Sequence, residues 1–393
     1  MNKILTVAAN LVVLTVAAAA SELSLEKLTS AEKRQVVVHE WGTFTSVANE
    51  TGDSARWAAL SGPADLPCFV ARLGSGDYKD RAIGKVRMET PVLYFYSKAP
   101  VTLSVNVAFP EGWITEWYPN ATRVTPASIS GIPPEHYSNG EIRWDQVHVS
   151  PGASPKLPVS QAASHYFAAR ETDAAPIRVG SQWEKLIFYR GVADFSVPLR
   201  PVISPQGAVR ITNAGPQPIP LAMLFENRAG KIGFRLITGL TTDAQMESPE
   251  LTGSLAEIRS RLEAHLVEFG LYPKEAAAMV ETWRDSWFEE GMRLFYIAPR
   301  EMVDRVLPLQ VQPAPSTTVR VFVGRIEILS PAMRRRIDSL AAANDLKGLQ
   351  QIGRFLGPFT TQMERTDGSR QRPSAIQSVF DRTRPFGAAA CVN

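Results

Sequence analysis

The chain contains 393 residues, of which 45% are hydrophobic and 21% are charged, with 26 glycines and 29 prolines. These proportions are close to those of ordinary globular proteins, so they exclude a disordered, collagen-like or low-complexity chain. The formal net charge of +3 is too small to indicate a nucleic-acid-binding protein. At about 100–200 residues per domain, a chain of this length is expected to form two domains.

The first twenty residues have the layout of a secretory signal peptide. Lys3 supplies the positive charge, residues 4–20 are mostly apolar, and Ala18-Ala19-Ala20 offers a small-residue cleavage site. Cleavage near Ala20 is therefore expected, and it would place the mature chain in the periplasm or the extracellular space. An uncleaved membrane anchor is the alternative, because the apolar stretch is just short of the roughly 20 residues that span a bilayer.

Cys68 and Cys391 are the two cysteines of the chain. An even number of cysteines in an oxidising compartment permits one disulfide bond. A bond between Cys68 and Cys391 would tie the C-terminal tail to the N-terminal part of the chain. The alternative is one buried thiol and one terminal thiol.

Strand patterns dominate the first two thirds of the chain. Residues 21–35 are expected to form a short helix or leader segment, and the β-branched and aromatic run that follows predicts a strand. The clearest strand is Val101–Phe109, where apolar and polar residues alternate. Further strands are predicted at 92–96, 113–118, 141–149, 185–190, 208–213, 219–226 and 231–237. Many short strands without intervening helices predict an antiparallel, sandwich-like domain over residues 36–245.

From about residue 246 the pattern changes to helix. A capping box begins one helix at Ser254, a second helix is expected from Pro273 to Gly291, and Ser330-Pro331 begins a third. Short strands are expected at 292–297 and 319–328, and a short helix at 300–306. Residues 246–358 are therefore expected to form a smaller, mainly helical domain, and residues 359–393 a tail. The fold class is α+β.

Several common catalytic motifs are missing from the sequence. We find no Gly-x-Ser-x-Gly, no phosphate-binding glycine loop, no dinucleotide fingerprint and no His-Glu-x-x-His. Hydride transfer, kinase chemistry and the zincin mechanism are therefore not expected, and no particular cofactor is indicated.

Carboxylates next to aromatic residues recur along the chain, as in Glu116-Trp117-Tyr118 and Trp144-Asp145. Sugar rings stack on aromatic side chains, and glycoside hydrolysis needs two carboxyl groups about 5–10 Å apart. We therefore expect Glu116 and Asp145 to be the acid–base pair of an exported enzyme that acts on a glycan or similar polar polymer. Ordinary aromatic packing is the alternative.

Three histidines of the β-rich region, His39, His148 and His165, are candidate ligands of a metal ion, with Glu40, Glu171 or Asp173 as an oxygen ligand. No two of them have the close spacing of a His-x-His pair, so such a site would be assembled only by the fold. On a strand, His39 and Trp41 point to one face, where both are candidate binding residues. A structural role in the sheet is the alternative for His39.

Residues 165–173 form the densest polar and aromatic segment. His165 is a potential base, Tyr166 offers a phenol, and the Arg170 guanidinium suits a carboxylate or sulfate group of a ligand. The alternative is the end of a strand with an internal Arg–Glu or Arg–Asp pair.

Three segments carry a resemblance to other proteins. They are His39-Glu40-Trp41-Gly42-Thr43-Phe44-Thr45, residues 87–96 and residues 286–291. They resemble stretches of uncharacterised exported bacterial proteins, and the similarity extends from about Val36 to Arg354. The resemblance implies a bacterial, exported protein and implies no activity.

Two classes of function therefore stay open. The first is the extracytoplasmic enzyme on a glycan. The second is a non-catalytic binding or assembly protein of the envelope or extracellular space, because long loops on a β-scaffold commonly carry binding surfaces. A metal site is compatible with either class. No nucleic acid partner and no membrane-spanning segment in the mature chain are expected.

Overall fold

The structure is a computed structural model that describes residues 35–61, 66–74, 82–128, 137–161, 164–368, 375–376 and 378–379. The predicted signal peptide, the leader segment up to residue 34 and Cys391 lie outside the described residues, so the predicted disulfide to Cys68 stays a prediction. In the described part of the chain, no helix is both long and apolar enough to cross a membrane.

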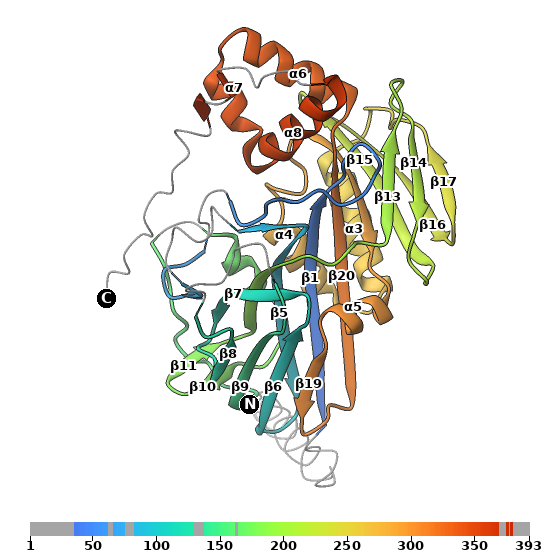
Figure 1. The fold of residues 1–393 in the computed structure, drawn as a ribbon. Coiled ribbons are helices and arrows are strands. Elements are labelled where there is room, and N and C mark those ends of the chain that lie inside the picture. The colour runs from blue at the N-terminus through green and yellow to red at the C-terminus, as the bar shows by residue number, and fades with distance from the viewer. Residues whose placement is uncertain are drawn as a thin grey trace, which may run out of the picture.

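The largest sheet of the described residues, called the main sheet, contains nine strands (Figure 1). Their order is β16 (Lys231–Leu240), β15 (Ile219–Arg228), β18 (Gly291–Ile297), β20 (Thr317–Ile328), β1 (Val36–Val47), β5 (Val86–Ser97), β12 (Ile187–Ala193), β7 (Gly112–Tyr118) and β3 (Ala71–Arg72). β1 and β20 pair in parallel, and the other neighbours in this order pair antiparallel.

Three smaller sheets accompany the main sheet. The second sheet has the order β11 (Gln182–Glu184), β10 (Ile177–Val179), β9 (Gly140–Val149), β6 (Val101–Phe109) and β19 (Leu309–Gln312), with β8 (Arg123–Thr125) paired to β9. The third contains β13 (Leu199–Ile203), β14 (Val209–Asn213) and β17 (Asp243–Met246), and the fourth contains β2 (Trp57–Ala58) and β4 (Ile83–Gly84).

The helices lie in two groups. The first group is η2 (His165–Arg170), α3 (Leu255–Glu268), α4 (Pro273–Thr282) and the short α5 (Arg300–Val306). The second group is α6 (Pro331–Ala342), α7 (Leu346–Gln351), η3 (Gly353–Phe355) and α8 (Leu356–Asp367), and its α-helices gather at one end of the molecule in Figure 1. Local capping explains several starts: Ser254 and Ser330 accept hydrogen bonds from backbone N–H groups of α3 and α6 at 3.1 Å.

Three apolar clusters form the core. One face of the main sheet packs against the second and third sheets, through side chains such as Phe44, Trp144 and Ile211. The opposite face packs against α3 and α4 around Trp41. At the Val47 end of β1, the face of the main sheet that carries Trp41 packs against α6, α7 and α8. The central strands of the main sheet are therefore covered on both faces, which explains why β1 is almost entirely buried.

The structure confirms a strand-rich fold with antiparallel sheets and a helical C-terminal region. The strand predicted at Val101–Phe109 is β6, with the same bounds. The boundary expected near residue 245 does not separate two sheets, because β18 and β20 come after it and lie between β15 and β1.

Two helical segments differ from expectation. The helix that begins at Pro273 ends at Thr282 and not near Gly291, although Trp283 and Trp287 are both buried and their rings are stacked. The expected tail from residue 359 begins inside α8, which continues to Asp367 because its apolar side chains pack against the end of the main sheet.

Candidate functional site

Two β-bulges interrupt the main sheet at the same level. In β5 the register shifts against both neighbours between Met88 and Val92, so β5 carries one extra residue at this point. Thr90 lies inside this bulge with a φ of 48°, and Pro91 follows it. In β7 the register against β12 shifts around Thr115. Bulges redirect side chains and are common beside functional sites.

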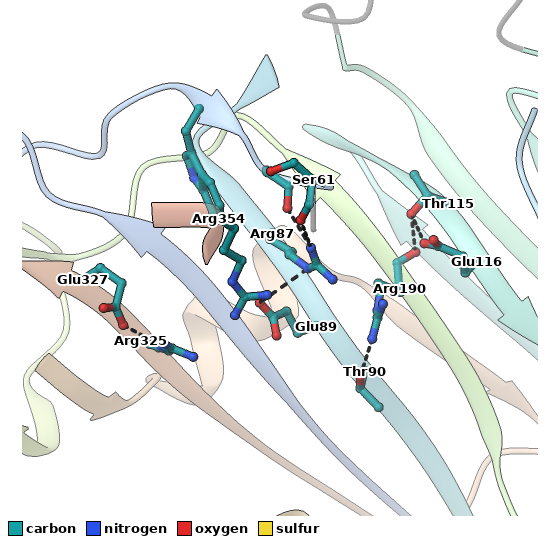
Figure 2. Close-up of polar contacts among 12 residues, drawn as sticks. Ser61, Arg87, Glu89, Thr90, Thr115, Glu116, Arg190, Arg325, Glu327 and Arg354 are labelled. Carbon is teal, nitrogen blue, oxygen red and sulfur yellow. Dashed lines mark hydrogen bonds and ion pairs between the residues drawn. The ribbon is translucent and has the colours of Figure 1, made fainter. Parts of the chain in front are cut away.

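These side chains form a buried surface, called the polar face, on the side of the main sheet that carries Trp41 (Figure 2). It spans six neighbouring strands from β18 to β7 and includes one arginine of η3. Its members are Thr43, Thr45, Arg87, Glu89, Thr90, Thr115, Glu116, Arg190, Arg293, Arg325, Glu327 and Arg354. Apart from Arg354, each of these residues is at most 6% exposed.

Glu89 is a buried carboxylate of the polar face that pairs with two arginines, Arg354 and Arg87. Its Oε1 atom lies 2.9 Å from Arg354 Nη1 and 3.4 Å from Arg87 Nε. Burial alone would raise the pKa of Glu89, but the positive charges of Arg354, Arg87, Arg325 and Arg190 together hold this pKa below its ordinary value of 4.5. Glu89 is therefore ionised at neutral pH although it is buried.

A second charge cluster lies on β18 and β20. Arg325 Nε donates to Glu327 Oε1 at 2.6 Å, and Arg325 Nη2 donates to Glu289 Oε1 at 2.6 Å. Arg293 Nε lies 2.8 Å from the same Glu327 oxygen. Burial lowers the pKa of Arg325, but the charges of Glu327 and Glu289 more than offset this effect and raise the pKa. The guanidinium group of Arg325 stays charged inside the protein.

Arg190 connects the two bulges. It lies opposite Glu116 across β12 and β7, and its Nη2 atom lies 3.5 Å from the hydroxyl of Thr90. Thr115 donates a hydrogen bond to Glu116 at 2.5 Å. Because neighbouring strands are about 4.8 Å apart, Glu89 on β5 and Glu116 on β7 come from backbones about 10 Å apart, on either side of Arg190.

The buried donors of the polar face that have no hydrogen-bond partner among the described residues include the hydroxyls of Thr43 and Thr45, Arg325 Nη1 and Arg354 Nη2. Thr45 lies opposite Arg325 on β20 and opposite Arg87 on β5, so these donors belong to one patch. An unsatisfied buried donor costs about 1–3 kcal/mol, and a ligand with acceptor oxygens would remove this cost.

The short helix η3 covers this patch. The Phe355 ring centroid lies 5.0 Å from the guanidinium carbon of Arg325 and 5.0 Å from that of Arg354. Phe355 also packs against Trp57, with ring centroids 5.7 Å apart. Apolar residues therefore limit water at the polar face, and its electrostatic interactions are stronger than they would be at an open surface.

Of the predicted acid–base pair, one member belongs to the polar face and the other does not. Glu116 is fully buried in β7. Asp145 lies on β9 of the second sheet, where it forms an ion pair of 2.8 Å with Arg143 and 36% of its side chain is exposed. Glu89 and Glu327 are the other carboxylates of the polar face, and Glu89 is the nearer of the two to Glu116 in the strand order.

His39 and Trp41, the predicted binding residues of β1, have buried partners. His39 Nδ1 lies 2.7 Å from Glu275 Oε2, and the imidazole stacks on Tyr272 with centroids 4.4 Å apart. Glu275 also accepts a hydrogen bond of 2.7 Å from the Tyr96 hydroxyl. Trp41 lies in the apolar cluster between the main sheet and α3 and α4. His39 therefore joins β1 to the start of α4.

The polar segment predicted at the end of a strand forms the 3-10 helix η2 instead. Arg170 donates to both carboxylate oxygens of Glu184, at 2.9 Å from Nε and 2.6 Å from Nη2. Tyr166 donates to the same carboxylate at 2.9 Å. His165 is partly exposed, 3.1 Å from Asp285. Arg170 thus has an internal carboxylate partner, as in the alternative prediction, but the partner is not one of its neighbours in the sequence.

The three predicted metal ligands lie on three different elements. His39 is on β1, His165 is on η2, and His148 on β9 lies 2.9 Å from the hydroxyl of Thr102. Within the residues that the structure describes, no group of three or more His, Cys, Asp and Glu side chains is arranged to hold a metal ion.

Comparison with known proteins adds little to this geometry. Neither a protein-family model nor a curated protein matches the chain. Among solved structures it is similar to the yeast delta-COP-I mu-homology domain, with a TM-score of 0.26 and 8% sequence identity. The match covers 75% of this chain and 96% of that chain. At this TM-score the likeness supports no conclusion about fold or function.

Sequence patterns identified Glu116 but not Arg87, Glu89, Arg325 or Arg354. One signal was present: a proline inside a strand-like run marks a bulge, and Pro91 follows Glu89-Thr90 directly. The contribution of Arg354 has no local signal, because it depends on how η3 packs against the sheet.

Proposed function

We propose that the polar face binds an anionic ligand, whose oxygen atoms accept hydrogen bonds from its arginine and threonine side chains. One observation carries this proposal: Thr43, Thr45, Arg325 and Arg354 present buried donors that have no partner among the described residues. Burying such donors is unfavourable unless an acceptor is supplied, and anionic acceptors form the strongest hydrogen bonds.

The ligand class that suits this face best is a carboxylate-bearing sugar or a similar acidic, polar unit. A planar guanidinium group matches a carboxylate through two parallel hydrogen bonds. The threonine hydroxyls add donors that a sugar hydroxyl or carboxylate can use. Because Arg354 and Phe355 cover the face, ligand entry requires η3 to move away from β5.

The sharpest test replaces an unpartnered hydroxyl. Thr43→Val keeps the shape of the side chain and removes a hydroxyl that makes no hydrogen bond, so stability should be unchanged or slightly higher. Galacturonate binding, measured by calorimetry, should weaken by roughly tenfold in Thr43→Val, which is about 1.4 kcal/mol. Thr238→Val, an exposed change on β16, should leave binding unaltered.

Two results would reject this proposal. One is that the unaltered protein binds neither galacturonate nor glucuronate. The other is that Thr43→Val and Thr238→Val bind galacturonate equally well. Glucose serves as the neutral comparison, and equal affinity for glucose would contradict an anionic ligand.

A second candidate function is hydrolysis of a glycan, now with Glu116 and Glu89 as the carboxylate pair. The supporting observation is that both lie on the same face, on either side of Arg190. The ionised Glu89 suits the role of base or nucleophile, which leaves the role of acid to Glu116. Released reducing ends from a polysaccharide panel should disappear in Glu116→Gln and Glu89→Gln and persist in Asp145→Asn. Loss of activity in Asp145→Asn alone would favour the pair expected from the sequence.

Two broader features are also part of the proposal. The main and second sheets share one apolar cluster, which supports a sandwich-like arrangement. Export to the periplasm or the extracellular space rests on the N-terminal pattern of Lys3 and the apolar residues after it. Mass spectrometry of the mature N-terminus in an expression host tests export, and an intact Met1 in the purified chain would contradict it.

A further inference from the structure

A cavity of about 360 Å³ lies between α5, β19 and β20, away from the polar face. Figure 1 shows α5 and β19 beside β20. Its polar lining includes Arg300, Asp304, Gln310, Gln312 and Arg320. The volume lies in the usual range of about 300–1,000 Å³ for small-ligand sites.

Arg320 links this cavity to the interior of the main sheet. Arg320 is only 6% exposed, and its Nε atom donates to Glu40 Oε2 at 2.5 Å. Its Nη1 atom donates to Asp304 Oδ1 at 2.7 Å. Its Nη2 atom is buried with no hydrogen-bond partner in the described part of the chain. The guanidinium group is thus held from two sides, and with a side chain only 1% exposed it fixes Asp304 at the wall of the cavity.

Arg300 and Asp304, the other charged residues of the cavity wall, are fixed by hydrogen bonds and ion pairs. Arg300 Nε donates to Asp304 Oδ2 at 2.7 Å, and Arg300 Nη1 donates to the backbone oxygen of Thr318 at 2.9 Å. Asp304 is therefore fixed between two arginines. Glu40 and Asp304 carry two negative charges against the two positive charges of Arg300 and Arg320, so this group has no net formal charge.

We propose that the cavity binds a neutral saccharide unit. A balanced set of charges gives no net attraction for an ionised ligand, whereas sugar hydroxyls both donate and accept hydrogen bonds. The carboxylate of Asp304 offers acceptors at the cavity wall, and the amides of Gln310 and Gln312 offer both donors and acceptors. Leu309 and Val311 line the same cavity and suit the apolar face of a sugar ring.

This inference does not depend on the proposed function of the polar face. The probes are cellobiose and N,N′-diacetylchitobiose, with binding measured by saturation-transfer NMR and calorimetry on the full mature chain. Arg300→Gln and Gln312→Ala alter exposed lining residues, so both variants are expected to fold. We expect at least one probe to bind, and each variant to weaken that binding by roughly tenfold, which is about 1.4 kcal/mol.

Arg305→Gln is the matched control, because Arg305 is an exposed arginine of the same helix and does not line the cavity. It should bind the probe as the unaltered protein does. Galacturonate binding at the polar face should be unchanged in Arg300→Gln, which separates the two sites. The inference is overturned if neither probe binds, if Arg305→Gln weakens binding as much as Arg300→Gln, or if acetate displaces the disaccharide.

Discussion

Arg354 Nη1 lies 2.9 Å from Glu89 Oε1, so an ion pair joins the C-terminal helical region to the centre of the main sheet. The carboxylate is 1% exposed and the arginine side chain 15%. Removing one partner of a buried pair leaves a charge in a medium that solvates it poorly, and this costs about 3–5 kcal/mol in proteins. The pair is therefore a sensitive probe of how the helices are held.

We expect Arg354→Met to lower the free energy of unfolding by about 3 kcal/mol, the lower end of that range, because Arg87 still accompanies Glu89. Arg365→Met on the exposed side of α8 is the control and should change stability little. The double variant Arg354→Met with Glu89→Gln should lose less stability than the sum of the two single losses, because each single variant already breaks the pair. Equal losses in Arg354→Met and Arg365→Met by urea unfolding would contradict the pairing.

The lowered pKa of Glu89 predicts how the stability of the protein depends on pH. This pKa is lower in the folded protein than the ordinary value of 4.5 that applies to the unfolded chain. The unfolded chain therefore takes up this proton first, so the contribution of Glu89 is complete above pH 4.5 and is lost as the pH falls through the folded pKa. Urea unfolding at a series of acidic pH values should show a shallower decline in Glu89→Gln. Parallel curves for the two proteins would show that Glu89 does not contribute.

The φ of 48° at Thr90 predicts that glycine is tolerated there better than alanine. A residue with a side chain is strained in this conformation by about 1–2 kcal/mol, and glycine removes most of that strain at an entropic cost of about 0.5–1 kcal/mol. Thr90→Gly and Thr90→Ala both lose the buried hydroxyl that lies 3.5 Å from Arg190 Nη2, so their difference isolates the backbone. Thr90→Gly should be more stable than Thr90→Ala by about 0.5 kcal/mol, whereas Thr238→Gly on the ordinary strand β16 should be less stable than Thr238→Ala by about 0.5–1 kcal/mol. Thermal unfolding of the four variants checks the two opposite signs, and the same order at both positions would refute the strain.

Two histidine–glutamate pairs allow a matched comparison of burial. Glu275 is fully buried and accepts hydrogen bonds from His39, the Tyr96 hydroxyl and the backbone N–H of Tyr272. Glu275→Ala should lower the free energy of unfolding by about 3 kcal/mol or more. Glu268→Ala, which breaks an exposed pair with His265, should cost less than about 1 kcal/mol. If chemical denaturation gives equal losses of stability for Glu275→Ala and Glu268→Ala, burial does not strengthen the His39–Glu275 pair.

Local features of the fold could be predicted from the sequence because their causes are local. The alternation in residues 101–109 defines β6, and Ser254 and Ser330 begin helices through hydrogen bonds within one turn. The placement of β18 and β20 could not be predicted in this way. The sequence predicts each of them as an isolated short strand. In the sheet, β18 lies beside β15 and β20 lies beside β1, and both of these neighbours are distant in the sequence.

The same distinction applies to the polar face. Glu116 could be singled out because two aromatic residues, Trp117 and Tyr118, follow it directly, and this pattern is visible in the sequence. Glu89 depends on Arg354, Arg325 and Arg190, which come from η3, β20 and β12. A charged residue inside an apolar strand can be recognised in a sequence, but its partners are set by strand order, which single-sequence patterns do not reveal.

The parallel pairing of β1 with β20 has a consequence for the order of folding. Residues 36–47 must pair with residues 317–328, so the middle of the main sheet stays incomplete until almost the whole chain is available. Pairings this distant in sequence form slowly, and until then the edge of β1 is open to other strands. A chain that crosses a membrane from its N-terminus, as we propose here, would deliver β20 among its last segments. Such a protein would need protection of its first strand during export, and it would not tolerate division into separately folding halves.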